Sequence, residues 1–152
     1  MTDTDVHSHP AIRSLPPIMW GALVGITQAA SPLAVRWLEP ATVHALYLAF
    51  IAAVYIGFAV ADGRAKVIAG ESAIAAGFVL LASAGVNGTA WMIVAAYAAH
   101  GLKDFWQQRI HYVAHTRWWP PFCATVDLLV AVILSASAGR PRAPVCMLRS
   151  EG

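Results

Sequence analysis

Five apolar segments separated by short polar or turn sequences dominate this chain. Each approaches the roughly 20 residues that an α-helix needs to cross a bilayer core of about 30 Å. The apolar runs are unbroken, whereas strands of a membrane barrel alternate apolar and polar residues. The pattern therefore predicts an all-α membrane bundle over residues 15–138 with about five transmembrane helices, near Pro17–Leu38, Ala41–Ala61, Ala65–Ala84, Thr89–His115 and Pro120–Ala138.

The fourth segment is the weakest membrane span. It is strongly apolar only from Thr89 to Ala99, and Lys103 and Asp104 follow soon after. A helix that continues to about His115 would still be long enough to span. Its second half would then face other helices or emerge along the membrane surface, so four spans are the alternative.

The regions outside the apolar segments read as tails and turns. Residues 1–14 are polar and are predicted to be a disordered tail, and residues 139–152 a flexible one. Asp3 and Asp5 argue against a cleaved signal peptide, whose N-terminal region is positively charged. Pro32 predicts a kink in the first helix, and 85–88 predicts a tight turn.

Composition supports lipid as the solvent. Of the 152 residues, 59% are hydrophobic and only 12% charged, against about 25% charged in soluble domains. The net charge of +2 comes without a dense basic stripe, so no nucleic-acid partner is expected. Cys123 and Cys146 form no metal motif, and nothing in their spacing favours a disulfide between them.

The distribution of basic residues predicts an orientation in the cell membrane. Cytoplasmic loops carry an excess of Lys and Arg, so the side with more of them is assigned to the cytoplasm. With five spans this is the side of the N-terminus. It carries Arg13, Arg64, Lys66, Lys103, Arg109 and Arg117, whereas the other side carries Arg36, Arg140, Arg142 and Arg149.

Ionisable residues inside spans are costly and are functional candidates by default. Glu71 lies about six residues into the third helix, roughly 9 Å deep, and Asp127 lies similarly deep in the fifth. His100 and Asp104 lie in the cytoplasmic half of the fourth. We therefore expect His100, Asp104, Glu71 and Asp127 to gather near the cytoplasmic face as candidate catalytic residues.

The fourth helix also carries a polar stripe. His100, Asp104, Gln107, His111 and His115 are spaced by four, three, four and four residues and fall within an arc of about 80°. Such pairs can chelate a divalent metal ion, with His100, Asp104 and Glu71 as the candidate ligands. The same groups could relay protons, or hydrogen-bond between helices.

Several polar residues have simpler explanations. Asp62 and Arg64 read as a polar turn, Arg109 as an interfacial charge that meets lipid phosphates, and His111 and His115 as solvated residues near the membrane surface. Glu71 or Asp127 could pair with a neighbouring cation and lock the bundle. All remain secondary candidates for a polar site.

Two sets of residues resemble a family of small bacterial multi-pass membrane proteins of unknown function. One set comprises His100-Gly101 with Asp104, Trp118-Trp119-Pro120-Pro121 with Cys123, and Asp127; the other comprises 55–58, 62–64 and Glu71. The resemblance covers about residues 41–135 and implies a helical bundle without an established activity or cofactor. Some members carry a Trp just before the Asp and a His pair soon after it, where this chain has Lys103, Gln107 and Gln108.

Three functions fit these patterns. A structural or binding protein would use the polar cluster to fix helix packing or hold a ligand. An enzyme would act on a lipid-like substrate by metal-assisted or general acid–base chemistry. A proton-linked carrier would use the same groups as a relay, although the outer halves of the third and fourth helices offer few polar groups. Membrane lipid is the expected partner, and a homo-oligomer is compatible with the sequence.

Overall fold

The chain is an all-α bundle, as the hydrophobic pattern predicts. The computed structural model describes residues 16–114 and 116–139, and this part contains helices and no strand. The predicted tails lie almost wholly outside the described residues. The helices are α1 (Pro17–Ala30), a 3-10 turn η1 (Ser31–Leu33), α2 (Pro40–Asp62), α3 (Ala65–Asn87), α4 (Ala90–Ile110) and α5 (Trp119–Ala138).

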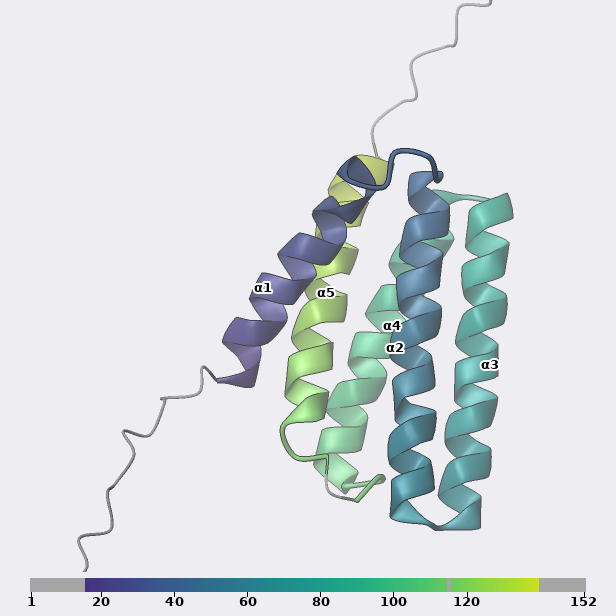
Figure 1. Cartoon of the computed structure of the whole chain (residues 1–152), viewed down its shortest axis with the longest axis vertical. Coiled ribbons are helices and arrows are strands. Elements are labelled where there is room, and N and C mark those ends of the chain that lie inside the picture. The colour runs from purple at the N-terminus through teal and green to yellow at the C-terminus, as the bar shows by residue number, and fades with distance from the viewer. Residues whose placement is uncertain (1–15, 115, 140–152) are drawn as a thin grey trace, which may run out of the picture.

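The helices run alternately up and down, and α4 lies between the others. It packs against α5, α3 and α2, while α1 packs against α5 and α2 against α3. Figure 1 shows α1 and α3 at opposite edges of the bundle, and α1 has little contact with α2. A polar residue on the inner side of α4 therefore meets side chains from several helices.

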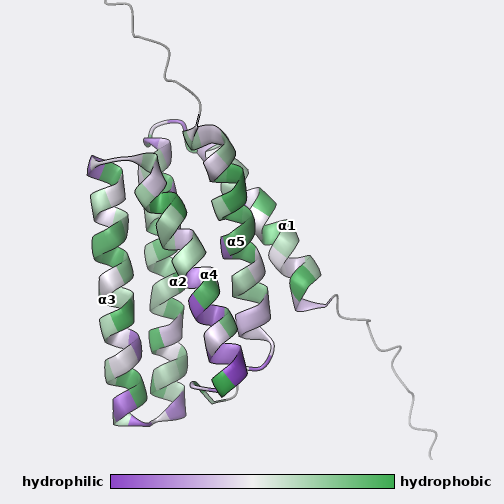
Figure 2. Ribbon diagram, turned by 180° about the vertical axis from the view of Figure 1, so that it is seen from behind, coloured by the Kyte–Doolittle hydropathy of each residue, from purple (hydrophilic) through white to green (hydrophobic). Residues whose placement is uncertain are grey.

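Three of the helices, α2, α3 and α5, are long and apolar enough to cross a membrane, and they indicate a membrane protein. Large apolar side chains point outward, including Phe50, Leu80 and Val132, each about two-thirds exposed. Lipid chains can cover such a surface without cost, whereas water cannot. Helix α1 has only 14 residues, and the lower half of α4 is hydrophilic in Figure 2.

Local chemistry sets the helix ends. Pro40 opens α2, where a missing N–H costs nothing, and Gly63 closes it with φ of 80°. The first apolar segment was expected to run to Leu38, but α1 ends at Ala30 and the 3-10 turn containing Pro32 follows. Proline cannot donate the backbone hydrogen bond that would continue the α-helix.

Two further boundaries differ from the sequence-based expectation. Helix α3 continues through the predicted turn to Asn87, and Gly88 ends it. Helix α4 stops at Ile110, about one turn before His115, because His111 adopts the left-handed conformation with φ of 50°. The polar stripe therefore stays helical only as far as Gln107, and the chain after it turns toward α5.

Small residues let α1 approach α5 closely. A β-carbon built on Gly21 would lie 2.6 Å from the carbonyl oxygen of Phe122, and one on Gly25 would lie 3.2 Å from that of Val126. Glycines four residues apart form one face of a helix and favour close packing in membranes. This face therefore lets α1 lie against α5, the helix that carries Asp127.

Candidate functional site

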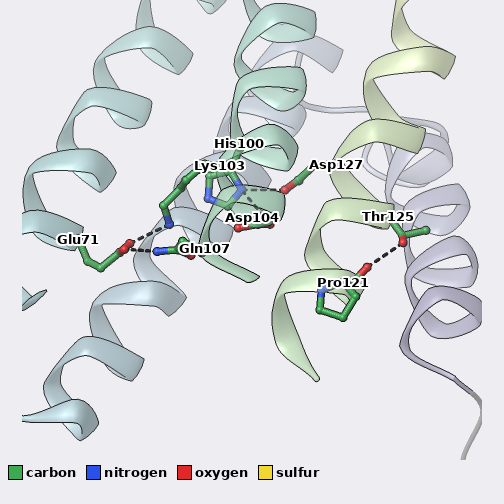
Figure 3. A network of polar contacts seen from close by, with 8 residues as sticks. All are labelled: Glu71, His100, Lys103, Asp104, Gln107, Pro121, Thr125 and Asp127. Carbon is green, nitrogen blue, oxygen red and sulfur yellow. Dashed lines mark hydrogen bonds and ion pairs between the residues drawn. The ribbon is translucent and has the colours of Figure 1, made fainter. Parts of the chain in front are cut away.

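A cluster of charged and polar side chains, drawn in Figure 3, lies inside the bundle, in the half where α2 ends and α3 begins. Glu71 from α3, His100 and Asp104 from α4, and Asp127 from α5 are all 0% exposed. An ionised carboxylate in such surroundings is costly unless other charges or hydrogen bonds compensate it. The cluster divides into two parts that compensate their charges differently.

The first part, which we call the polar lock, consists of Glu71, Lys103 and Gln107 and joins α3 to α4. The Lys103 ammonium lies 2.8 Å from Oε2 of Glu71, and the Gln107 amide donates a hydrogen bond to Oε1 of the same carboxylate. The ammonium also sits 3.6 Å from the centre of the Tyr55 ring, in cation–π geometry. The Glu71 carboxylate is therefore fully paired within the protein.

The second part, which we call the His–Asp–Asp centre, consists of His100, Asp104 and Asp127 and joins α4 to α5. Nδ1 of His100 lies 2.7 Å from Oδ2 of Asp127 and 3.7 Å from Oδ2 of Asp104. Each of the three residues offers one ligand-type atom, and these atoms all lie within 4.8 Å of one another. Two carboxylates thus converge on a single imidazole.

Several atoms of the His–Asp–Asp centre have no hydrogen-bond partner among the described residues. They are Nε2 of His100, both carboxylate oxygens of Asp104 and Oδ1 of Asp127. Buried polar atoms are nearly always paired, and each exception calls for a cause such as a bound ion or water. The His–Asp–Asp centre therefore differs from the Glu71 carboxylate, whose oxygens all have partners within the protein.

Aromatic and small residues shape the walls of this centre. The rings of Tyr55 and Phe78 meet the His100 imidazole edge-on, with centroids 5.8 and 4.8 Å away. A β-carbon on Gly101 would come within 2.9 Å of Leu128, so only glycine lets α5 pack this close to α4. Asp127, one residue before Leu128, reaches His100 because of this contact.

The structure brings the four candidate catalytic residues into one region but splits them between the two parts. Glu71, a candidate metal ligand with His100 and Asp104, bonds to Lys103 and Gln107 instead. The compact ligand-type group has Asp127 in its place. Two secondary candidates, Arg109 and His111, are exposed, and His115 lies outside the described residues.

Asp62 and Arg64 form more than a polar turn. The Arg64 guanidinium makes two hydrogen bonds to the Asp62 carboxylate, which raise the pKa of the guanidinium. Arg64 also donates to the carbonyl of Tyr112, and Asp62 accepts from the amide of Ala114 at 2.7 Å. The α2–α3 turn therefore holds the segment between α4 and α5 in place.

A second polar network, in the other half of the bundle, was not predicted. The Gln28 amide donates to the Tyr97 hydroxyl at 2.7 Å, and that hydroxyl donates to the carbonyl of His44 at 2.9 Å. All three residues are buried. Tyr97 lies three residues before His100, so it extends the α4 stripe by one turn, and that spacing could have revealed it.

Comparisons with known proteins assign no family to this chain: no family, curated protein or solved structure matches it. The chemistry of the donor set must therefore be judged by itself. Imidazole with two carboxylates suits divalent ions such as Zn²⁺, Mn²⁺ and Fe²⁺. The His–Asp–Asp centre fits such an ion in ligand type, ligand number and burial.

Proposed function

We propose that this chain is a multi-pass protein of the cell membrane that binds one divalent metal ion at the His–Asp–Asp centre. The polar lock has a structural role and fixes the packing of α3 on α4. The observation that carries the proposal is the convergence of three fully buried ligand-type side chains, whose other polar atoms lack partners. Glu71, by contrast, needs no further partner.

Charge balance supports a bound cation. The pair of Lys103 and Glu71 is neutral, which leaves two carboxylates and one imidazole at the His–Asp–Asp centre. A divalent ion bound to ionised Asp104, ionised Asp127 and neutral His100 gives no net charge. Neutral ensembles are the ones that tolerate a low-dielectric interior.

A bound ion would act as a Lewis acid on an oxygen that reached it. The residues of this chain would hold the ion and exclude water from it. The buried Tyr55 ring and the partly buried Phe78 ring cover the imidazole, and Gly101 allows α5 to close the centre from the other side. These contacts supply the rigid support that metal ligands require.

Metal analysis of the purified full-length chain tests this proposal. After exposure to Zn²⁺ or Mn²⁺ and removal of free ion, we expect about one ion per chain. Asp127→Asn and His100→Gln are expected to lower occupancy at least tenfold, because each removes a ligand. Glu39→Gln is the matched control, since Glu39 is exposed.

Two results would contradict metal binding. One is a wild-type chain that retains no ion above the level of the Asp127→Asn variant. The other is equal loss of ion in Asp127→Asn and in Glu39→Gln. Either result would leave protons to neutralise the carboxylates, and both parts of the cluster would then be structural.

We further propose that the N-terminus and the α2–α3 turn face the cytoplasm, because most basic residues lie on that side. Trp37 lies just before α2, and Lys66 lies at the start of α3, at the other end of the bundle. Both side chains are exposed and can be changed to cysteine. In a chain whose Cys146 is replaced by serine, a membrane-impermeant thiol reagent added to intact cells is expected to label the Trp37→Cys variant and to spare Lys66→Cys. The reverse pattern would invert the topology.

A further inference from the structure

A cavity of about 530 Å³ lies at the end of α4, beside the segment that leads to α5. We call it the loop cavity. Its volume falls within the range of small-molecule sites. Its lining includes Gln107, Gln108, His111, Thr116, Arg117 and Pro120. None of the ligand-type residues of the His–Asp–Asp centre lines it, so its ligand would be separate from the metal ion.

The lining chemistry selects an anion that also carries a hydroxyl group. Arg117 and His111 supply donors for an anion, and none of the described lining residues is acidic. Gln107 is 3% exposed, and its Oε1 atom has no partner among the described residues. Since its amide nitrogen donates to Glu71, this oxygen is free to accept a hydrogen bond from a hydroxyl group.

The loop cavity is preorganised by contacts outside it. Arg64 holds the carbonyl of Tyr112 at 2.8 Å, and Asp62 holds the amide of Ala114. Among the described residues, His111 is the only one other than glycine with a positive φ. Such a conformation in a residue with a side chain costs energy and clusters at ligand sites. A preformed cavity loses less entropy when it binds.

The loop cavity also lies at the level where headgroups are expected. Trp106 and Trp118 are nearly half exposed close to it, and tryptophan side chains collect at the membrane–water interface. Helix α4 changes from apolar to hydrophilic toward this end (Figure 2). A ligand with a charged phosphate and an apolar tail would match both environments.

We propose that the loop cavity binds a phosphate ester of a polyol, with Arg117 and His111 on the phosphate and Gln107 on a hydroxyl group. A glycerophospholipid headgroup and a soluble glycerol phosphate share this chemistry. The proposal goes beyond metal binding and does not rest on it. It assigns a ligand class to a surface that the His–Asp–Asp centre does not include.

Native mass spectrometry of the full-length chain in a neutral detergent tests this proposal. With phosphatidylglycerol and phosphatidylcholine added in equal amounts, we expect about tenfold greater retention of phosphatidylglycerol. Both lipids carry the phosphate, but the choline cation of phosphatidylcholine opposes its placement beside Arg117 and offers no hydroxyl group to Gln107. Arg117→Gln is expected to abolish this preference. Arg109→Gln is the control, because Arg109 is an exposed arginine of α4 outside the cavity lining.

Two ligand comparisons sharpen the result. Phosphatidylethanol has the charge of phosphatidylglycerol without its free hydroxyl groups, and we expect it to be retained severalfold less. Glycerol 3-phosphate identifies the source of the ligand. If it displaces phosphatidylglycerol at millimolar concentration, the cavity accepts the soluble ester; if it does not, the cavity takes the ester from the lipid.

Equal retention of phosphatidylglycerol and phosphatidylcholine would overturn the proposal, and so would equal losses in Arg117→Gln and Arg109→Gln. Retention of phosphatidylethanol equal to that of phosphatidylglycerol would remove the role of Gln107. The Arg117→Gln variant is expected to keep its metal ion. Failure of lipid binding with normal metal content would therefore leave the metal-binding proposal intact.

Discussion

Replacing Lys103 with methionine leaves the Glu71 carboxylate buried inside the bundle without a cationic partner. The Glu71 side chain is 1% exposed and that of Lys103 is 10% exposed, so neither charge can be screened by solvent where it stands. Removing one partner of a buried ion pair costs about 4 kcal/mol. At 2–4 °C per kcal/mol for a chain of this size, Lys103→Met should lower Tm by roughly 8–16 °C.

The opposite substitution, Glu71→Gln, should cost less. The amide side chain can still accept a hydrogen bond, and the Lys103 ammonium still lies over the Tyr55 ring. A lysine side chain can also extend toward the membrane surface when its partner is lost. We expect a loss of about 1–2 kcal/mol, the usual contribution of one hydrogen bond.

The double variant of Lys103→Met and Glu71→Gln tests whether the two residues stabilise the bundle as a pair or independently of each other. It leaves no unpaired buried charge but loses the cation–π contact with Tyr55, which is worth about 2 kcal/mol when desolvated. It should therefore be more stable than Lys103→Met alone by about 2 kcal/mol. This recovery is the sign of a coupled pair.

Thermal unfolding in detergent can be followed with a thiol-reactive dye, because Cys123 is free and 3% exposed in the folded bundle. Cys146, which lies outside the described residues, is replaced by serine so that Cys123 alone reports unfolding. A double variant less stable than Lys103→Met would refute the polar lock, and so would equal effects of the two single substitutions.

Three further predictions follow from packing and exposure. Gly21→Ala should lower stability by about 1–3 kcal/mol in the same dye assay, because its methyl group meets α5. Gly57→Ala is the control and should be neutral or stabilising, because nothing lies within 4 Å of the added methyl group. Equal effects of the two substitutions would contradict this packing. Asp62→Ala should accelerate hydrogen exchange at the amide of Ala114, because it removes the carboxylate that accepts this amide's hydrogen bond. An unchanged exchange rate would contradict this contact. A spin label at Leu102, which is 63% exposed, should relax faster with oxygen than with a water-soluble paramagnet, whereas the opposite order would place this part of α4 outside the bilayer.

Hydrophobic patterning was enough to predict the all-α bundle, because apolar runs in lipid leave the backbone few alternatives to the helix. It could not give the end of α1, which depends on where the missing N–H of Pro32 interrupts the helix. It also could not give the end of α4. Nothing in the sequence requires His111 to adopt a positive φ, and the structure alone shows this turn.

Depth within each helix predicted that the acidic residues would lie at one level, but depth does not determine their partners. His100 and Lys103 are three residues apart and point about 60° away from each other around α4. Helix α3 approaches on the Lys103 side, so Glu71 pairs there, and α5 brings Asp127 to His100. Partner choice depends on helix rotation, which hydropathy does not reveal.

The central claim is that a metal ion bound to this bundle is coordinated by His100. Pulsed electron paramagnetic resonance of the Mn²⁺-loaded protein tests this directly, because a coordinated imidazole nitrogen couples magnetically to the ion. We expect a ¹⁴N coupling in the wild-type protein that disappears in His100→Gln and persists in His111→Gln, whose imidazole lies outside the centre. Bound Mn²⁺ without a nitrogen coupling, or a coupling that survives in His100→Gln, would contradict the account.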